Sequence, residues 1–151
     1  RYTERGFFMT LLQILCDSTA SWSRLPPASE ARIDALTAEV DFDLPVEYLD
    51  FLRYSNGGKG SLCIEPWHFQ LCSAEEVLKF NLGYRVEEFL PGWFAIGSSG
   101  SSDMLAIREG DGSPCPVYMV PFVPMAQSDA IQIAHDFEMF AMAFGRNGEG
   151  A

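Results

Sequence analysis

The segment 44–58 constrains the fold most, because it contains a short helix together with its start and its end. Pro45 suits the first position of a helix, where its fixed φ is favourable and its missing N–H is no loss. Apolar residues then recur at helical spacing, which predicts one apolar face. They are Tyr48, Leu49 and Leu52, with Val46 and Phe51 beside them. Asn56-Gly57-Gly58 tolerates left-handed backbone and therefore ends the helix.

Two further helices are predicted before this segment. The first spans about Thr3 to Cys16, where apolar residues again follow helical spacing. Residues 17–27, with a Pro26-Pro27 pair, indicate a loop, and Trp22 is expected to pack that loop against the core. Ser29 can then cap a second helix whose inner face is formed by three apolar residues. These are Ile33, Leu36 and Val40.

After Gly58-Lys59-Gly60 the pattern becomes typical of short strands and turns. The predicted strands are Leu62–Ile64, His68–Leu71, Trp93–Ile96, Met104–Ile107, Pro116–Val120 and Ile131–Ala134. Ser73 and Glu76 match a capping box, which predicts a helix from Ala74 to about Leu82. The prolines around the fifth strand favour a sheet edge or broken strand ends.

The C-terminal part of the chain predicts a closing helix. Asp136 can cap it, and an apolar stripe follows at positions i, i+3, i+4 and i+7 before Gly145. The stripe consists of Phe137, Phe140, Ala141 and Phe144. Strands joined by hairpins are antiparallel, so the order predicts an α+β fold. In this fold N-terminal helices, one inserted helix and a C-terminal helix pack on one face of a meandering antiparallel sheet.

The net charge of −11 limits the classes of partner. An acidic surface repels phosphate backbones, so nucleic acid is not expected as a ligand, whereas basic proteins are attracted. The apolar run from Phe7 to Cys16 is too short to cross a membrane. The four cysteines form no CxxC pair, although Cys63 and Cys72 could face each other across a hairpin. We interpret them as reduced, mostly buried thiols of a cytoplasmic protein.

The sequence contains no recognised catalytic, cofactor or metal motif. His135 precedes Asp136, which is already assigned as a helix cap, and His68 lies inside a predicted strand. The stretch 97–103 is rich in Gly and Ser but lacks the lysine of a phosphate-binding loop, so it is interpreted as a hairpin turn. No catalytic residue, cofactor or metal ligand is therefore predicted.

The densest charged feature is a set of carboxylates around the second and third helices. It consists of Glu39, Asp41, Asp43, Glu47 and Asp50. One interpretation is a solvated helix face, and the other is a contact surface for a basic protein. Sequence alone leaves both open.

The quoted motifs, in their order and spacing, resemble the SUKH superfamily, which includes the Smi/Knr-type regulators. The resemblance rests on the segment 44–58, the Ser73 to Glu76 motif, Phe94-Ala95-Ile96-Gly97 and the closing helix. It covers about residues 29–144 and implies a protein-binding α+β domain without catalytic residues. Many bacterial members are immunity proteins that neutralise a cognate secreted toxin, often a nuclease, of contact-dependent or polymorphic toxin systems.

The prediction is therefore a single SUKH-like domain over residues 1–151, with an N-terminal helix and loop at 1–28, a core at 29–144 and a tail at 146–151. Its expected function is non-enzymatic binding of a basic toxin domain. The alternatives are a regulatory module with an endogenous partner, and a small-ligand binder or enzyme that uses the region of Glu65, Trp67 and Asp103. In addition to the acidic set, the candidate contact residues are Glu65, Trp67 and Asp103. The oligomeric state is not predicted.

Overall fold

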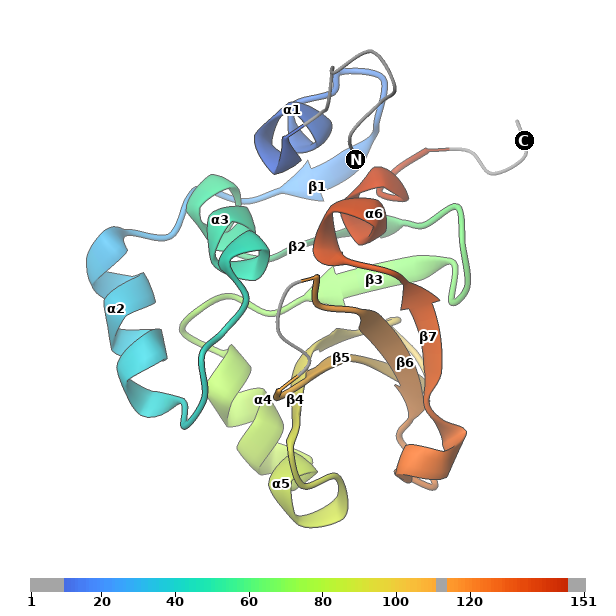
Figure 1. The fold of residues 1–151 in the computed structure, drawn as a ribbon. Helices are drawn as coiled ribbons and strands as arrows, with labels where there is room; N and C mark the ends of the chain where they lie inside the picture. The colour runs from blue at the N-terminus through green and yellow to red at the C-terminus, as the bar shows by residue number, and fades with distance from the viewer. Residues whose placement is uncertain (1–9, 111–113, 147–151) are drawn as a thin grey trace.

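The structure is a computed structural model and describes residues 10–110 and 114–146. In these residues seven strands form one sheet in the order β1 to β7, and every neighbouring pair is antiparallel (Figure 1). The strands are β1 (Trp22–Arg24), β2 (Gly58–Ser61), β3 (His68–Leu71), β4 (Trp93–Ser98), β5 (Asp103–Arg108), β6 (Val117–Pro121) and β7 (Ile131–Ala134). The predicted α+β class is confirmed.

The helices precede, interrupt and follow the sheet. They are α1 (Leu11–Leu15), α2 (Glu30–Glu39), α3 (Val46–Tyr54), α4 (Val77–Gly83), α5 (Val86–Phe89) and α6 (Phe137–Met142), with a 3-10 turn at Gln127–Asp129. Two helices, α4 and α5, lie between β3 and β4, whereas one inserted helix was predicted. Of the predicted first helix, residues 3–9 lie outside the described residues.

The sheet has two parts, because β3 and β4 are paired only through Gln70 with Ser98 and Leu71 with Gly97. At this junction a Cβ on Gly97 would collide with the backbone carbonyl of Gln70. Glycine is required there so that the two strands can approach each other. Before this junction β4 runs along α4 and α5 instead of along β3.

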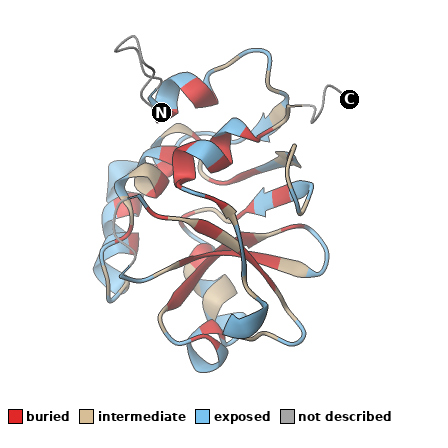
Figure 2. Ribbon diagram, turned by 45° about the vertical axis from the view of Figure 1, so that its right-hand side comes forward, coloured by how far each residue is buried: buried red, intermediate tan, exposed pale blue. Residues whose placement is uncertain are grey.

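Alternate residues of β4 and β5 enter two separate cores. Phe94 and Ile107 belong to the larger core, which α1, α2, α3 and α6 cover. Ala95 and Met104 belong to a smaller core on the opposite face, closed by α5 and the segment 122–130. Figure 2 shows the central strands buried along their length. The prediction that helices cover only one sheet face is therefore wrong for β4–β6.

The helix that anchored the sequence prediction is confirmed as α3, with small differences at its start. Pro45 precedes the first helical residue instead of occupying it, and Val46 is 66% exposed, outside the apolar face. Tyr48, Phe51 and Leu52 are fully buried. Gly57 and Gly58 have φ of 96° and 141°, as the predicted helix end requires.

Trp22 packs as predicted, but the segment around it is a strand and not only a loop. Its ring lies 5.3 Å from that of Phe144 and 6.1 Å from those of Phe51 and Phe69. The partner strand β2 occupies Gly58–Ser61, earlier than the predicted Leu62–Ile64. Leu62 forms only an isolated bridge with Phe144.

Of three other local predictions, one is wrong, one is decided between its two alternatives, and one is confirmed. The capping box does not form: α4 begins at Val77, and the Ala74 N–H donates instead to Asn56 Oδ1 at 2.7 Å. Strand β6 is paired on both sides, so its prolines mark strand ends and not a sheet edge. The closing helix is confirmed: Asp136 accepts a 2.8 Å hydrogen bond from the Met139 N–H, and all four residues of the stripe are buried.

Candidate functional site

The predicted contact residues do not form one site. Glu39 and Asp41 border a hollow between α2 and α4, whereas Glu47 and Asp50 lie on α3 beside α1. Asp43 is exposed on the link between α2 and α3 and lines neither hollow. The five carboxylates of the acidic set therefore do not border one common hollow.

The part on α3 is partly neutralised. Asp50 accepts a 2.8 Å hydrogen bond from Arg53, and the same guanidinium binds Glu30 on α2 at 2.8 Å. Both bonds raise the pKa of Arg53, that from Glu30 most strongly. Glu30 and Arg53 therefore join α2 to α3, and Asp50 is paired with the same arginine within α3.

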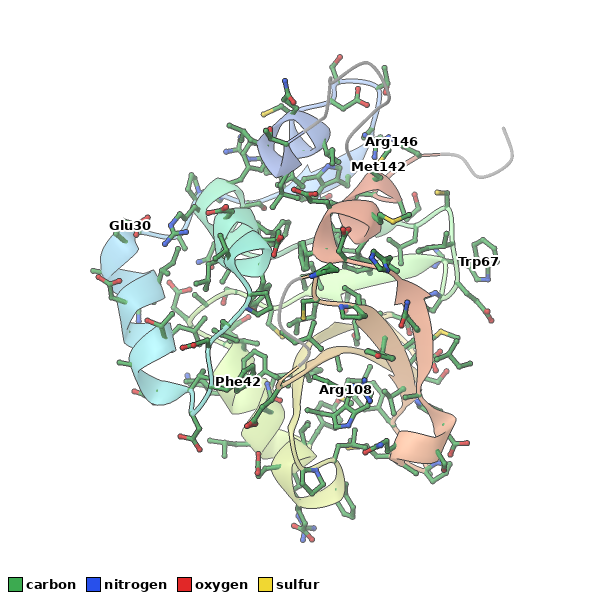
Figure 3. The ribbon with its side chains drawn as sticks, viewed as in Figure 1. Glu30, Phe42, Trp67, Arg108, Met142 and Arg146 are labelled. Atoms are coloured by element: carbon green, nitrogen blue, oxygen red, sulfur yellow. The ribbon has the colours of Figure 1, made fainter. Side chains whose placement is uncertain are left out.

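The remaining predicted residues lie elsewhere. Trp67 is 55% exposed at the outer end of the β2–β3 turn, far from Phe42 (Figure 3), and Glu65 precedes it in that turn. The backbone of Asp103 closes the β4–β5 turn through hydrogen bonds with Ser99, which confirms the predicted hairpin. A shallow hollow over β2 and β3 contains His68 and Ser101, but Glu65, Trp67 and Asp103 do not line it. The structure therefore does not assemble the small-ligand site that these residues suggested.

The hollow beside α2, which we call the acidic hollow, has a volume of about 510 Å³. It is lined by Glu39, Val40, Asp41, Phe42, Leu78, Asn81, Leu82, Glu87, Trp93, Phe94 and Glu109. These residues come from the end of α2, the α2–α3 link, α4, α5, β4 and the residue after β5. The fold thus brings together segments that are far apart in the sequence.

Asn81 fixes the inner wall of the acidic hollow. Its side-chain oxygen accepts from the Ala95 N–H at 2.8 Å, and its amide nitrogen donates to the Ala95 carbonyl at 2.9 Å. The same nitrogen donates to the Val77 carbonyl at 2.8 Å. Because β3 does not reach this part of β4, the side chain of Asn81 replaces a neighbouring strand and attaches α4 to the sheet.

The apolar surface of the acidic hollow is built from half-buried side chains. Phe42 reaches from the α2–α3 link towards α4 (Figure 3), and its ring meets that of Phe94 edge-on at 5.9 Å. Leu78 is half-buried, and Leu82 is 77% exposed at the outer end of α4. Trp93 is buried in the wall, with the Arg108 guanidinium 5.5 Å from its ring.

The rim carries four exposed carboxylates, those of Glu39, Asp41, Glu87 and Glu109. Within residues 10–110 and 114–146, none of the four takes part in an ion pair, and no lysine or arginine lines the hollow. Sequence reasoning missed Glu87 and Glu109. No local signal marks them, because only the packing of α5 and β5 brings them beside Glu39.

The structure also provides information on metal sites, exposed histidines and helices that could cross a membrane. In the described part of the chain no group of three or more His, Cys, Asp or Glu residues could hold a metal ion. His68 is exposed on β3, and His135 is exposed beside the helix cap. Nor does any helix among these residues have the length and apolar character that crossing a membrane requires.

The cysteines are free, but only Cys115 is buried. The β2–β3 register places Cys72 at the level of Gly57, away from Cys63 at the turn, so the two do not face each other. Burial raises the pKa of the Cys72 thiol to about 12, which leaves it protonated and unreactive at neutral pH. The prediction of mostly buried thiols is therefore wrong for Cys16, Cys63 and Cys72, which are exposed or half-buried.

Comparison with known proteins gives a match to one protein family. No curated protein matches the chain. The sequence model of the SMI1 / KNR4 family (SUKH-1) matches residues 27–142, a range that includes the third helix, the whole acidic hollow and the closing helix. Because this match covers most of the chain and the fold agrees with the motifs that suggested it, the chain belongs to the SMI1/KNR4 family (SUKH-1).

Proposed function

We propose that this chain is a non-enzymatic protein-binding domain, and specifically an immunity protein that neutralises a cognate basic toxin. Membership of the SUKH-1 family supports the proposal, since members of this superfamily are commonly immunity proteins. The observation that carries it is the group of four rim carboxylates of the acidic hollow, none of which forms an ion pair within the described residues.

The physical basis is electrostatic steering. Complementary charge accelerates association between proteins and favours one orientation, and exposed charges retain this effect without being part of the fold. A nuclease toxin needs a basic surface for its polyanionic substrate. A carboxylate surface on an immunity protein binds to that basic surface of the toxin and blocks access of the substrate.

Coexpression tests the proposal. A gene for a large secreted toxin next to the gene for this chain is expected, and its toxin domain is produced in a heterologous host with and without this chain. Coexpression should restore growth, and the two proteins should elute from a sizing column as a one-to-one complex. Absence of both effects would reject the immunity function and favour a regulatory module.

Charge reversal tests the electrostatic part. The Asp41→Lys, Asp43→Lys, Glu47→Lys variant should associate with the toxin domain more slowly than the wild type, most strongly at low salt. An unchanged association rate would show that these residues are only a solvated face.

A further inference from the structure

We infer that the acidic hollow is the docking site for a partner segment in which one apolar side chain is flanked by lysine or arginine residues. This inference rests on the proposed function, because it assumes a protein partner. It adds the position of the contact and the chemistry of the segment that binds there.

The apolar wall defines the central side chain of the partner. Phe42 and Leu78 are half-buried and Leu82 is largely exposed, and all three border the same hollow. An apolar side chain placed between them removes this surface from water, which favours binding. The volume of about 510 Å³ is sufficient for a large side chain and part of its backbone.

The rim defines the flanking residues. Its carboxylates come from three sides, namely α2 with its link, α5 and the end of β5. Among the residues that the structure describes, no lysine or arginine lines the hollow, so no basic side chain of this part of the chain compensates these charges there. Lysine or arginine residues on both sides of the apolar side chain would meet carboxylates from different elements.

The acidic hollow is also prepared for binding. Asn81 holds α4 against β4 with two hydrogen bonds to Ala95, of 2.8 and 2.9 Å, and the contact between Phe42 and Phe94 fixes the opposite wall. A site that is already formed loses little conformational freedom when it is occupied. A second copy of this chain is a poor occupant, because the net charge of −11 makes two copies repel each other.

Synthetic peptides test the inference without knowledge of the natural partner. The probe is a blocked peptide with two lysines on each side of one phenylalanine, added to the isotope-labelled full chain and followed by NMR. We expect saturable shifts at the Trp93 indole, the Asn81 side-chain amide and Leu82. The same peptide with glycine for phenylalanine should bind at least about fivefold more weakly. A third peptide with glutamine for every lysine should bind at least about fivefold more weakly at low salt.

Two pairs of variants locate the contact. Glu39→Gln with Glu109→Gln should weaken binding of the first peptide about fivefold at low salt. Asp34→Asn with Asp129→Asn removes the same charge at exposed positions outside the hollow and should change it less than about twofold.

A second pair of variants tests the apolar contact. Leu82→Ser should weaken binding, whereas Val123→Ser, at a residue that is 89% exposed elsewhere, should not. Equal shifts with the glycine peptide, or equal losses in both charge variants, would overturn the inference and show general attraction of cations. Such a result would reject the docking site and have no bearing on the coexpression test of the immunity function. If coexpression fails but the peptide binds specifically, the immunity function is rejected and the docking site is retained.

Discussion

Two groups of carboxylates in this protein differ in their partners. In the first group each carboxylate contacts an arginine from another part of the chain. Glu30 binds Arg53 at 2.8 Å, and Asp17 binds Arg146 at 2.8 Å. In the second group, on the rim of the acidic hollow, no carboxylate forms an ion pair with a described residue.

The paired carboxylates connect elements of structure. Arg53 joins α2 to α3 through Glu30, and Arg146 joins the end of α6 to the loop after α1 (Figure 3). Arg32 on α2 meets Glu75 before α4 at 3.3 Å. The acidic composition therefore serves two purposes: one group of carboxylates holds helices together, and the other leaves a charged surface available. The following predictions test this division, from the largest expected effect to the smallest.

The largest effect is expected at Asn81, because the acidic hollow exists only if α4 stays on β4. Asn81→Leu leaves the N–H and the carbonyl of the fully buried Ala95 without partners. Each unsatisfied buried group costs on the order of 1–3 kcal/mol, so the free energy of unfolding should fall by about 3 kcal/mol. Urea denaturation measures it, with Gln132→Leu on the exposed face of β7 as a control. A loss below about 1 kcal/mol would show that α4 is held by other contacts.

A smaller loss is expected from the cap of α6. Asp136→Ala removes the acceptor of the Met139 N–H and should lower the free energy of unfolding by about 1–2 kcal/mol. Asp136→Asn keeps an acceptor and should restore most of it. Glu39→Ala, in the second group, should change stability by less than about 0.5 kcal/mol, because the residue is exposed at the end of α2. Equal losses at Asp136 and Glu39 would show that a carboxylate with a hydrogen-bond partner in the fold contributes no more to stability than a rim carboxylate.

The pair of Asp17 with Arg146 should make stability depend on pH. Hydrogen bonds from Arg146 first, and then from the Thr19 N–H and hydroxyl, lower the pKa of Asp17 from 3.8 to about 2. The carboxylate therefore stabilises the folded state above pH 3.8, and this contribution disappears as the pH falls towards 2. Asp17→Asn should be less stable than the wild type at neutral pH, and the difference should shrink over that window. A difference that stays constant down to pH 2 would contradict the pairing.

The smallest effect on stability is expected when the rim is neutralised. Replacement of Glu39, Glu87 and Glu109 by glutamine, with Asp41→Asn, removes mutual repulsion and no attractive pair. Thermal unfolding should show an unchanged or slightly higher stability, by at most about 1 kcal/mol at low salt, and the gain should vanish at high salt. A clear loss of stability would show that the rim carboxylates, like those paired with arginines, contribute to the folded state.

Elements with local signals were predictable from the sequence. The glycines after α3, the Ser29 and Asp136 caps and the phenylalanine stripe of α6 each act through neighbouring residues, and all four are confirmed. Strand β2 was not predictable, because it depends on Trp22. A Cβ at Gly58 or Gly60 would lie within 2.9 Å of Trp22, so the strand needs glycines that strand propensity disfavours.

The candidate site was half predictable for the same reason. Glu39 and Asp41 stand out in the sequence as part of an acidic run, but Glu87 and Glu109 become their neighbours only through tertiary packing. Asn81 looks like an ordinary residue of a helix until Ala95, which pairs with β5, is seen without a strand partner on its other side. Prediction of the acidic hollow would have required the three-dimensional arrangement of α4 and β4.

The association rate with the cognate toxin domain tests the central claim most directly, namely that the rim carboxylates serve binding and not folding. Two variants that lose the same charge are compared by stopped flow at low salt. Glu39→Gln, Glu87→Gln, Glu109→Gln neutralises the rim, and a control variant neutralises exposed residues elsewhere. The control substitutions are Asp34→Asn, Glu76→Gln and Asp129→Asn. The rim variant should associate about tenfold more slowly than the control variant. Equal rates would contradict the claim and leave the rim as a solvated surface.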